Sequence, residues 1–229
     1  MKIVAAILAG GLGTRMGIDT PKQFLKIGNE YLFIRTLKTF NQSKLFDKLF
    51  LAMNISIFEE AKKFLKNYNL LDFVELIQGG QTRQQSSWNV IQTLTKATTL
   101  PDAIVIHDAA RCFIDFETLK RCVLSLSKHK AITCAVPAID TIAEVKGGKV
   151  VKVPDRRSLW HIQTPQAFHF DLIVKAHKKA LSEGVLNASD DAQLVIRYGE
   201  PVFIFEGDKR NIKVTDSYDL MVARAIVSD

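Results

Sequence analysis

The stretch IVAAILAGGLGTRMG, residues 3–17, decides the fold. Its apolar run, Ile3–Ala9, is short and rich in Val and Ile, which predicts a strand. The glycines that follow let the backbone approach a ligand closely and direct N–H groups towards phosphate oxygens. The spacing is not that of a P-loop, which ends in GK[ST], nor of a dinucleotide-binding loop, because Met16 occupies the place of its third glycine. We expect a phosphate-binding loop of another class; the alternative is an ordinary tight turn from strand to helix.

Short apolar runs alternate with amphipathic stretches along the first two thirds of the chain. Further strands are predicted at Lys48–Met53, Val74–Ile77, Ala103–Ile106 and Ile132–Val136, and helices between them at Ile57–Tyr68, Arg83–Lys96 and Phe116–Lys128. Later helices are predicted at Phe170–Leu181, Asp190–Arg197 and Ser217–Ile226, with a strand at Pro201–Phe205. This alternation is typical of an α/β fold, a mostly parallel twisted sheet with helices on both faces. We expect a single domain over residues 1–229.

The alternation breaks after Pro137. Two strand-like runs, Asp140–Val145 and Lys149–Val153, flank the pair Gly147-Gly148, which predicts a hairpin. A hairpin inserted in a parallel α/β fold has no place to bury both of its faces. We expect residues 138–157 to project as a β-arm that contacts a second subunit.

The net charge indicates an anionic partner but does not identify which kind. The formal net charge of +7 favours anionic ligands. The basic residues form no block, and no zinc-finger or RNA-recognition signature is present. Nucleic acid and small phosphorylated ligands explain the charge equally well.

The three cysteines, Cys112, Cys122 and Cys134, are odd in number and lack CxxC spacing. A disulfide framework and a zinc site are therefore not expected, and Cys122 is predicted to be buried in a helix. No apolar run approaches the roughly 20 residues that cross a bilayer. The first residues also lack the cleavage-site pattern of a signal peptide, so we expect a cytoplasmic protein without a membrane partner.

The sequence HDAAR, residues 107–111, ends a predicted strand. Ligands of open α/β sheets bind outside the carboxyl ends of the strands, and a carboxylate placed there suits Mg²⁺. Asp108 is therefore a candidate metal ligand, with Arg111 as its charged neighbour; the alternative is a structural Asp108–Arg111 ion pair. His107 is expected to serve packing.

Three further blocks contain residues that suit phosphates or a nucleotide. In GGQTRQQS, residues 79–86, helix-start amides and Ser86 suit a base or ribose, and Arg83 suits phosphate, although an ordinary capped helix accounts for the pattern nearly as well. The neighbouring Arg156 and Arg157 suit a second phosphate, with a solvated charge pair as the alternative. Lys213, in NIKVT, residues 211–215, suits a triphosphate as a point charge.

Together these blocks resemble the 2-C-methyl-D-erythritol 4-phosphate cytidylyltransferase family. The matching motifs, in chain order, are Arg15-Met16, Pro21-Lys22-Gln23, Gly79–Ser86, His107–Arg111, Asp140-Thr141, Asp155–Gln166 and Asn211–Thr215. The chain departs from the family pattern at Cys112, Ala143 and Ile196. A related family, ribitol 5-phosphate cytidylyltransferase, shares the nucleotide loops, but Leu159-Trp160 and Ala110 favour the erythritol enzyme.

The resemblance implies a Rossmann-like nucleotidyltransferase fold, a homodimer, and an arm that completes the partner's site. It implies CTP and a polyol phosphate as substrates and Mg²⁺ as cofactor. The implied catalytic residues are Arg15, Lys22 and Lys213, and the implied metal ligand is Asp108. The implied nucleotide-binding residues are Ala9, Gly10, Gly11, Gly13, Gly80, Gln81, Ser86 and Ala109. The implied substrate-binding residues are Thr141, Arg156, Arg111 and Thr164. Two rival classes stay open, a CTP-binding regulator without turnover and a nucleic-acid-binding protein.

Overall fold

A seven-stranded sheet forms the centre of the part of the chain that the computed structural model describes, residues 1–10 and 24–228. The strands follow the order β11-β7-β10-β6-β1-β4-β5. They are β1 (Ile3–Leu8), β4 (Lys48–Met53), β5 (Val74–Gln78), β6 (Ala103–Asp108), β7 (Ala131–Pro137), β10 (Trp160–His169) and β11 (Phe203–Glu206). The pairings are parallel except those of β10, which runs antiparallel to both β6 and β7. The prediction of a mostly parallel sheet is confirmed.

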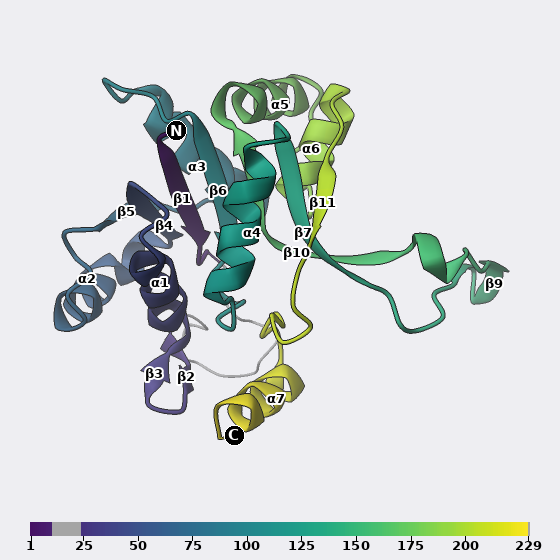
Figure 1. The fold of residues 1–229 in the computed structure, drawn as a ribbon, viewed down its shortest axis with the longest axis horizontal. Helices are drawn as coiled ribbons and strands as arrows, with labels where there is room; N and C mark the ends of the chain where they lie inside the picture. Colours follow the sequence, from purple (N-terminus) through teal and green to yellow (C-terminus); the bar gives the residue numbers. More distant parts are fainter. Residues whose placement is uncertain (11–23, 229) are drawn as a thin grey trace.

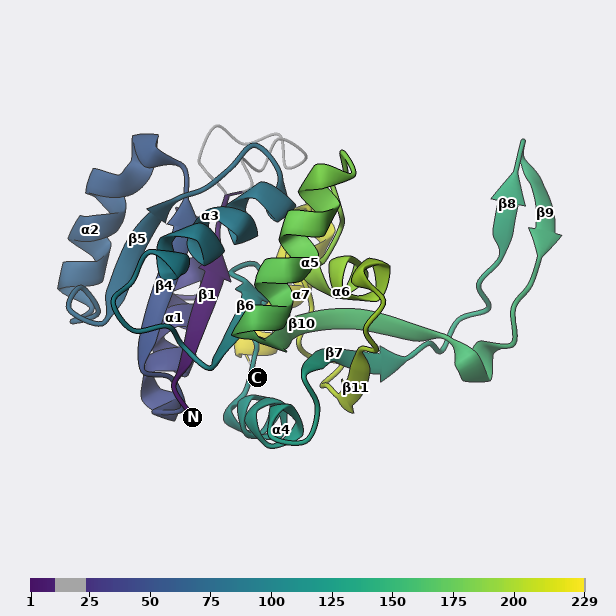
Figure 2. The same cartoon turned by 90° about the horizontal axis from the view of Figure 1, so that it is seen from above.

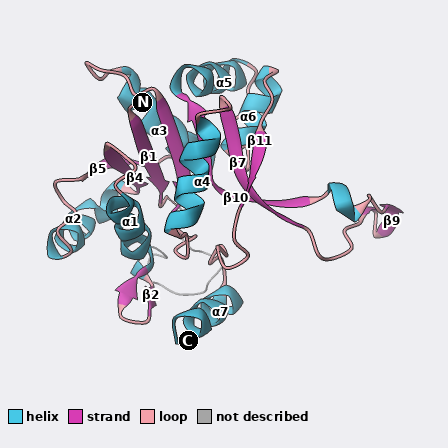
Figure 3. Cartoon of the chain, in the orientation of Figure 1, coloured by secondary structure: helices cyan, strands magenta, loops and turns pink. Residues whose placement is uncertain are grey.

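Helices cover both faces of this sheet (Figure 1; Figure 3). The helices are α1 (Leu32–Ser43), α2 (Phe58–Asn67), α3 (Arg83–Thr95), α4 (Phe116–Leu126), α5 (Phe170–Ser182), α6 (Asp191–Tyr198) and α7 (Ser217–Ser228). Alternate residues of β1 divide between two hydrophobic clusters. Ile3, Ala5 and Ile7 join side chains of α1, α2 and α4, whereas Val4 and Ala6 join side chains of α3, α5 and α6. A strand with apolar residues on both faces is stable only between two such layers.

The sequence pattern missed the long elements α1 and β10, as well as the two-residue strands β2 (Lys26–Ile27) and β3 (Glu30–Tyr31). Helix α1 contains the apolar spacing Phe33, Leu37 and Phe40, each fully buried, so its signal was present but not used. Strand β10 includes the polar run Gln163–Gln166 with a proline, which argues against a central strand. Its ladder with β7 is irregular between Ile162 and Gln166, and this irregularity accommodates the proline.

The hairpin of β8 (Glu144–Lys146) and β9 (Lys149–Lys152) projects away from the sheet, as Figures 1 and 2 both show. Gly147 and Gly148 have φ of 56° and 75°, the left-handed values that a two-residue hairpin turn requires. The predicted projecting hairpin is confirmed, but its first strand begins at Glu144 and not at Asp140, and its contact with a second subunit stays a prediction. Every residue of both strands is exposed.

Helix α7 and the short hairpin of β2 (Lys26–Ile27) and β3 (Glu30–Tyr31) lie beyond the carboxyl edge of the sheet (Figure 1). A separate hydrophobic cluster joins them, with Ile27, Val214 and Ala223 at its centre. Cys112 is buried in the same cluster, and the other two cysteines are also buried and unbridged. In the described part of the chain, no helix combines the length and apolar character needed to cross a bilayer.

The packing of α4 against the hydrophobic cluster that it shares with α1 and α2 leads to a prediction for two of its leucines. Leu119 is fully buried in the cluster, whereas Leu124 is 64% exposed. Leu119→Ala should lower the free energy of unfolding by about 2–5 kcal/mol, because it leaves a cavity under the sheet. Leu124→Ala should change it by about 0.5 kcal/mol or less. Urea titrations of both variants measure the difference, and equal losses would contradict the assigned face of α4.

Candidate functional site

A cavity of about 260 Å³ opens where the carboxyl ends of β1 and β6 meet. The described residues that line it are Leu8, Ala9, Gly10, Leu32, Gly80, Gln81, Thr82, Arg83, Ser86, Asp108, Ala109, Ala110, Lys213 and Thr215. Strands β4 and β6 lie on opposite sides of β1, so the chain changes direction across the sheet at this point. Open α/β sheets bind ligands at such a switch point.

Asp108, the last residue of β6, lies at the base of the cavity with its side chain only 9% exposed. Its Oδ1 accepts a hydrogen bond from Arg83 Nε at 3.0 Å, and its Oδ2 pairs with Lys213 Nζ at 2.6 Å. Burial by itself would raise the pKa of Asp108, but the charges of Arg83 and Lys213 hold that pKa well below its usual range. The carboxylate is therefore ionised across the physiological pH range. The expected neighbour, Arg111, makes no direct ion pair with it.

Lys213 reaches Asp108 because its segment is fastened to the end of β6. The Val214 amide donates to the carbonyl of Ala110 at 2.9 Å, and Arg111 Nη1 donates to the carbonyl of Asn211 at 2.8 Å. Asn211 is fully buried and donates to the carbonyl of Thr164 at 2.9 Å. In the structure, Arg111 and Asn211 thus hold the segment on which Lys213 is presented.

The loop that enters α3 forms one wall of the cavity. Ser86 Oγ accepts from the Gly80 amide at 3.0 Å and donates to the carbonyl of Thr82 at 3.0 Å, and Gln85 Oε1 accepts from the Gln81 amide at 2.8 Å. A Cβ on Gly10 would lie 3.0 Å from Ser86 Oγ, so a glycine there lets the end of β1 approach this loop. Hydrogen bonds within the loop therefore hold this wall in place without a ligand.

Arg83 was expected to meet phosphate, and the structure instead commits it to two carboxylates. Its Nε donates to Asp108, and its Nη1 donates to Asp191 Oδ2 at 2.6 Å. Burial alone would lower the pKa of Arg83, but Asp191 and Asp108 raise it above its usual value. Asp191 follows the N-cap of α6, and sequence reasoning missed it because nothing local marks its partner 108 residues away.

His107 and Thr164 lie beneath the site. Thr164 Oγ1 accepts from the Asp108 amide at 3.1 Å, and because the carbonyl of Arg111 can only accept from His107 Nε2, the Nδ1 of the neutral ring accepts from the Thr164 hydroxyl at 3.1 Å. His107 Nε2 then donates to the carbonyl of Arg111 at 3.1 Å. Burial lowers the pKa of His107 to about 4, which keeps the ring neutral. His107 has the packing role expected of it, and Thr164 supports Asp108 from below.

The cavity brings together eight residues proposed from the sequence, Ala9, Gly10, Gly80, Gln81, Ser86, Asp108, Ala109 and Lys213. The arm residues Thr141 and Arg156 are exposed and do not line it, and Arg156 Nη1 donates to the carbonyl of Ile139 at 2.8 Å. Gly11, Gly13, Arg15 and Lys22 lie outside the described residues. Leu32 and Thr215 also line the cavity, although the sequence had marked neither as a site residue.

The donor set at the base of the cavity suits a metal ion shared with a substrate. Within residues 1–10 and 24–228, no group of three or more His, Cys, Asp or Glu side chains is placed to hold a metal ion alone. Mg²⁺ commonly takes one or two carboxylates and completes its shell with water and substrate phosphates. Asp108 provides one ionised carboxylate, each of whose oxygens retains a free lone pair after the contacts with Arg83 and Lys213.

Comparisons with known proteins agree over the full length of the chain. The family model for 2-C-methyl-D-erythritol 4-phosphate cytidylyltransferase (IspD) matches residues 3–229. The enzyme of that name from Geobacillus thermodenitrificans is 39% identical over 228 residues, which cover 100% of this chain and 98% of that protein.

Two solved structures share the fold. A 4-diphosphocytidyl-2C-methyl-D-erythritol synthase from Anaerococcus prevotii has a TM-score of 0.85 at 27% identity, covering 100% of this chain and 99% of that one. A 2-C-methyl-D-erythritol 4-phosphate cytidylyltransferase from Thermus thermophilus has a TM-score of 0.81 at 30% identity, with 100% of both chains covered. By the match of the family model and the identity with these relatives, the chain belongs to the 2-C-methyl-D-erythritol 4-phosphate cytidylyltransferase family.

Proposed function

We propose that this cavity transfers CMP from CTP to 2-C-methyl-D-erythritol 4-phosphate, giving 4-diphosphocytidyl-2-C-methyl-D-erythritol and pyrophosphate. The observation that carries the proposal is the Asp108–Lys213 pair, placed in one cavity with the Gly80–Ser86 loop in a chain of this family. The loop suits the cytosine and ribose, and the charged pair suits the phosphates.

The reaction needs no general base. A phosphate oxygen of the polyol substrate, already ionised, attacks the α-phosphorus of CTP. The bond from that phosphorus to the bridging oxygen breaks, and pyrophosphate leaves with the electron pair. Rate enhancement then rests on holding the two anions in line and on neutralising the charge that gathers on the α-phosphate.

The residues divide these tasks. Lys213 contributes a positive charge beside Asp108, and Arg15 and Lys22 are assigned to the triphosphate from their motifs. Asp108 would hold Mg²⁺, which neutralises phosphate charge when bound. Ala9, Gly10 and Ala109 line the cavity where the backbone approaches a nucleotide most closely.

The arm and its exposed apolar side chains support a homodimer. Val145, Val150, Val151 and Val153 are each more than half exposed, which is unusual for valines in one short hairpin. A two-stranded hairpin alone is at best marginally stable in water, so a second subunit is the natural cover for it. Thr141 and Arg156 would then hold the polyol phosphate in the partner's cavity, with Arg111 and Thr164 contributing from the body.

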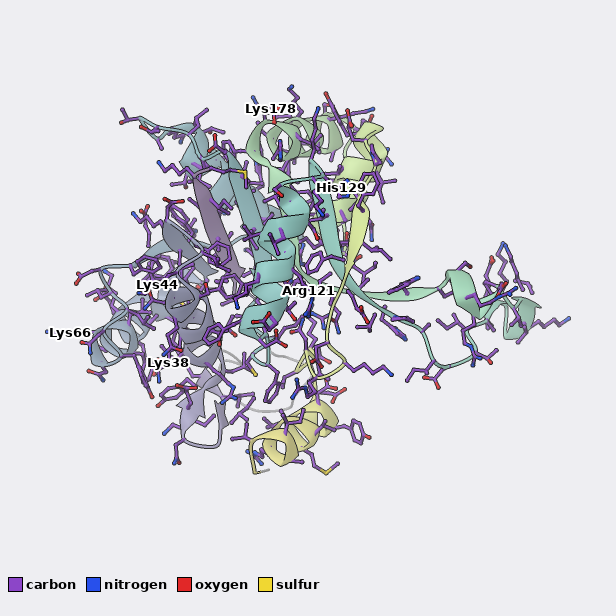
Figure 4. All side chains as sticks on the ribbon, viewed as in Figure 1. Lys38, Lys44, Lys66, Arg121, His129 and Lys178 are labelled. Carbon is purple, nitrogen blue, oxygen red and sulfur yellow. The ribbon has the colours of Figure 1, made fainter. Side chains whose placement is uncertain are left out.

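The distribution of basic residues supports small anions over nucleic acid. Among the basic residues labelled in Figure 4, Lys38, Lys66, Arg121 and Lys178 come from four different helices. A nucleic-acid-binding surface gathers such residues on one face. The buried, unbridged cysteines are consistent with a reducing compartment, so we place the enzyme in the cytoplasm.

The substrate is tested by measuring pyrophosphate release with a panel of nucleotides and polyol phosphates. CTP with 2-C-methyl-D-erythritol 4-phosphate should give the highest kcat/KM. A preference for ribitol 5-phosphate would assign the alternative enzyme, and CTP binding without pyrophosphate release would assign the regulator.

The first prediction about the site concerns the two lysines. Lys22→Ala and Lys213→Ala should each lower turnover by about 100-fold or more, because each removes a charge that stabilises the transition state. Lys209→Ala, an exposed lysine four residues before Lys213, should leave turnover unchanged. Near-normal turnover in the folded Lys22 and Lys213 variants would remove both from the mechanism.

A second prediction concerns Asp108. Asp108→Asn keeps the size of the side chain but removes the charge that Mg²⁺ requires, so activity should collapse and excess Mg²⁺ should restore little of it. Asp72→Asn, at an exposed position, is the control and should titrate with Mg²⁺ like the unaltered chain. An Asp108→Asn enzyme with ordinary activity and metal dependence would show that the ion is held elsewhere.

The third prediction tests the arm. Arg156→Ala should raise the KM for the polyol phosphate much more than the KM for CTP, whereas Lys149→Ala at the hairpin tip should change neither.

If the arm crosses a two-fold axis, mixing Lys22→Ala and Arg156→Ala chains should restore one complete site in each heterodimer. Activity of the mixture above the sum of the two parents is the expected result. Confirmed subunit exchange without recovered activity would refute the shared site.

A further inference from the structure

A series of ionic contacts links Asp191, Arg83, Asp108 and Lys213 and ends in the cavity. At its far end Asp191, 1% exposed, is held from several sides. Its Oδ1 accepts from Ser87 Oγ at 2.6 Å and contacts His177 Nε2 at 2.9 Å, and its backbone amide donates to Gln166 Oε1 at 3.0 Å. These contacts fix the position of Asp191 without any ligand in the cavity.

Arg83 connects this fixed carboxylate to the site. Nη1 reaches Asp191 Oδ2 at 2.6 Å and Nε reaches Asp108 Oδ1 at 3.0 Å, while Nη2 is buried without a partner among the described residues. Each carboxylate thus receives one hydrogen bond from the guanidinium. With Lys213 on Asp108 Oδ2, two cations face two anions, and the charges of these four side chains balance.

This balance depends on Asp191. A guanidinium that faces a single carboxylate favours two parallel hydrogen bonds to it. If Asp191 lost its charge, Arg83 would have Asp108 as its one remaining carboxylate and would turn to cover both of its oxygens. The positive charge of Arg83 would then lie beside Lys213 at Oδ2, and repulsion between the two cations would displace the lysine from its position in the cavity.

We propose that Asp191 and Arg83 are positioning residues. Asp191 restrains Arg83 to one oxygen of Asp108, and the other oxygen is thereby kept for Lys213. The consequence for turnover rests on the proposed cytidylyl transfer, whereas the consequence for Lys213 does not. Neither residue touches the reacting atoms in this role. Asp191 acts through Arg83, and Arg83 acts through the orientation of the Asp108 carboxylate.

The test compares Asp191→Asn with Asp190→Asn. Asp190 precedes it as the half-buried N-cap of α6, and asparagine caps a helix equally well, so the control removes one charge from the neighbouring position and preserves the cap. Two quantities are measured in the intact chain, turnover and the rate at which Lys213 is methylated by formaldehyde and borohydride, read by peptide mass spectrometry. Leu119→Ala serves as the comparison for lost stability alone.

Asp191→Asn should lower kcat roughly 10- to 100-fold, the range typical of residues that orient a metal ligand. It should also raise the methylation rate of Lys213 several-fold, while Asp190→Asn and Leu119→Ala leave that rate unchanged. Arg83→Lys keeps the charge, but one ammonium cannot span both carboxylates, so it should lower kcat in the same range. It provides the turnover test if Asp191→Asn does not fold.

The outcomes separate the two proposals. If the unaltered chain releases no pyrophosphate, the proposed function fails, and the methylation of Lys213 still decides the positioning role. If the unaltered chain is active but Asp191→Asn matches Asp190→Asn in kcat and in Lys213 methylation, the positioning role is wrong and the function stands. A loss of kcat that follows the melting temperature alone, with Leu119→Ala equally impaired, also overturns it.

Discussion

Asp108 lies nearly buried at the end of a central strand. A carboxylate without water around it is stable only when it is paired with cations. Two cations pair with Asp108, and they come from distant parts of the chain. Arg83 begins α3, and Lys213 belongs to the segment before α7. These ion pairs join the start of α3 and the segment before α7 to β6, and the same segments form walls of the cavity.

The sheet explains why these groups meet at one edge. Parallel strands end at the same side, so the residues after β1 and β6 lie together although about 100 positions separate them. Residues at the carboxyl ends are free of the ladder and can turn their amides and side chains towards a ligand. The helices complete the arrangement, because the two layers of apolar contact hold β1 and β6 rigid on both faces.

The arm has the opposite character from the body. The body packs buried apolar clusters on both faces of its sheet, whereas the arm has four exposed valines and no buried residue in either of its strands. The three departures from the family pattern also lie away from the cavity lining. Cys112 is buried under α7, Ile196 is exposed on α6, and Ala143 belongs to the arm. The chemistry proposed for the cavity does not depend on any of them.

The sequence by itself determined what local patterns can encode. Apolar period and glycine placement predicted the strands around the site and the two-residue turn of the arm, and the family resemblance implied eight of the residues that line the cavity. The sequence did not reveal β10, whose polar run is explained by partners on β6 and β7, nor the contact of Arg83 with Asp191. Only the tertiary structure decided those, because the stability of a buried charge depends on groups that are near in space and remote in sequence, and no local pattern records their distance.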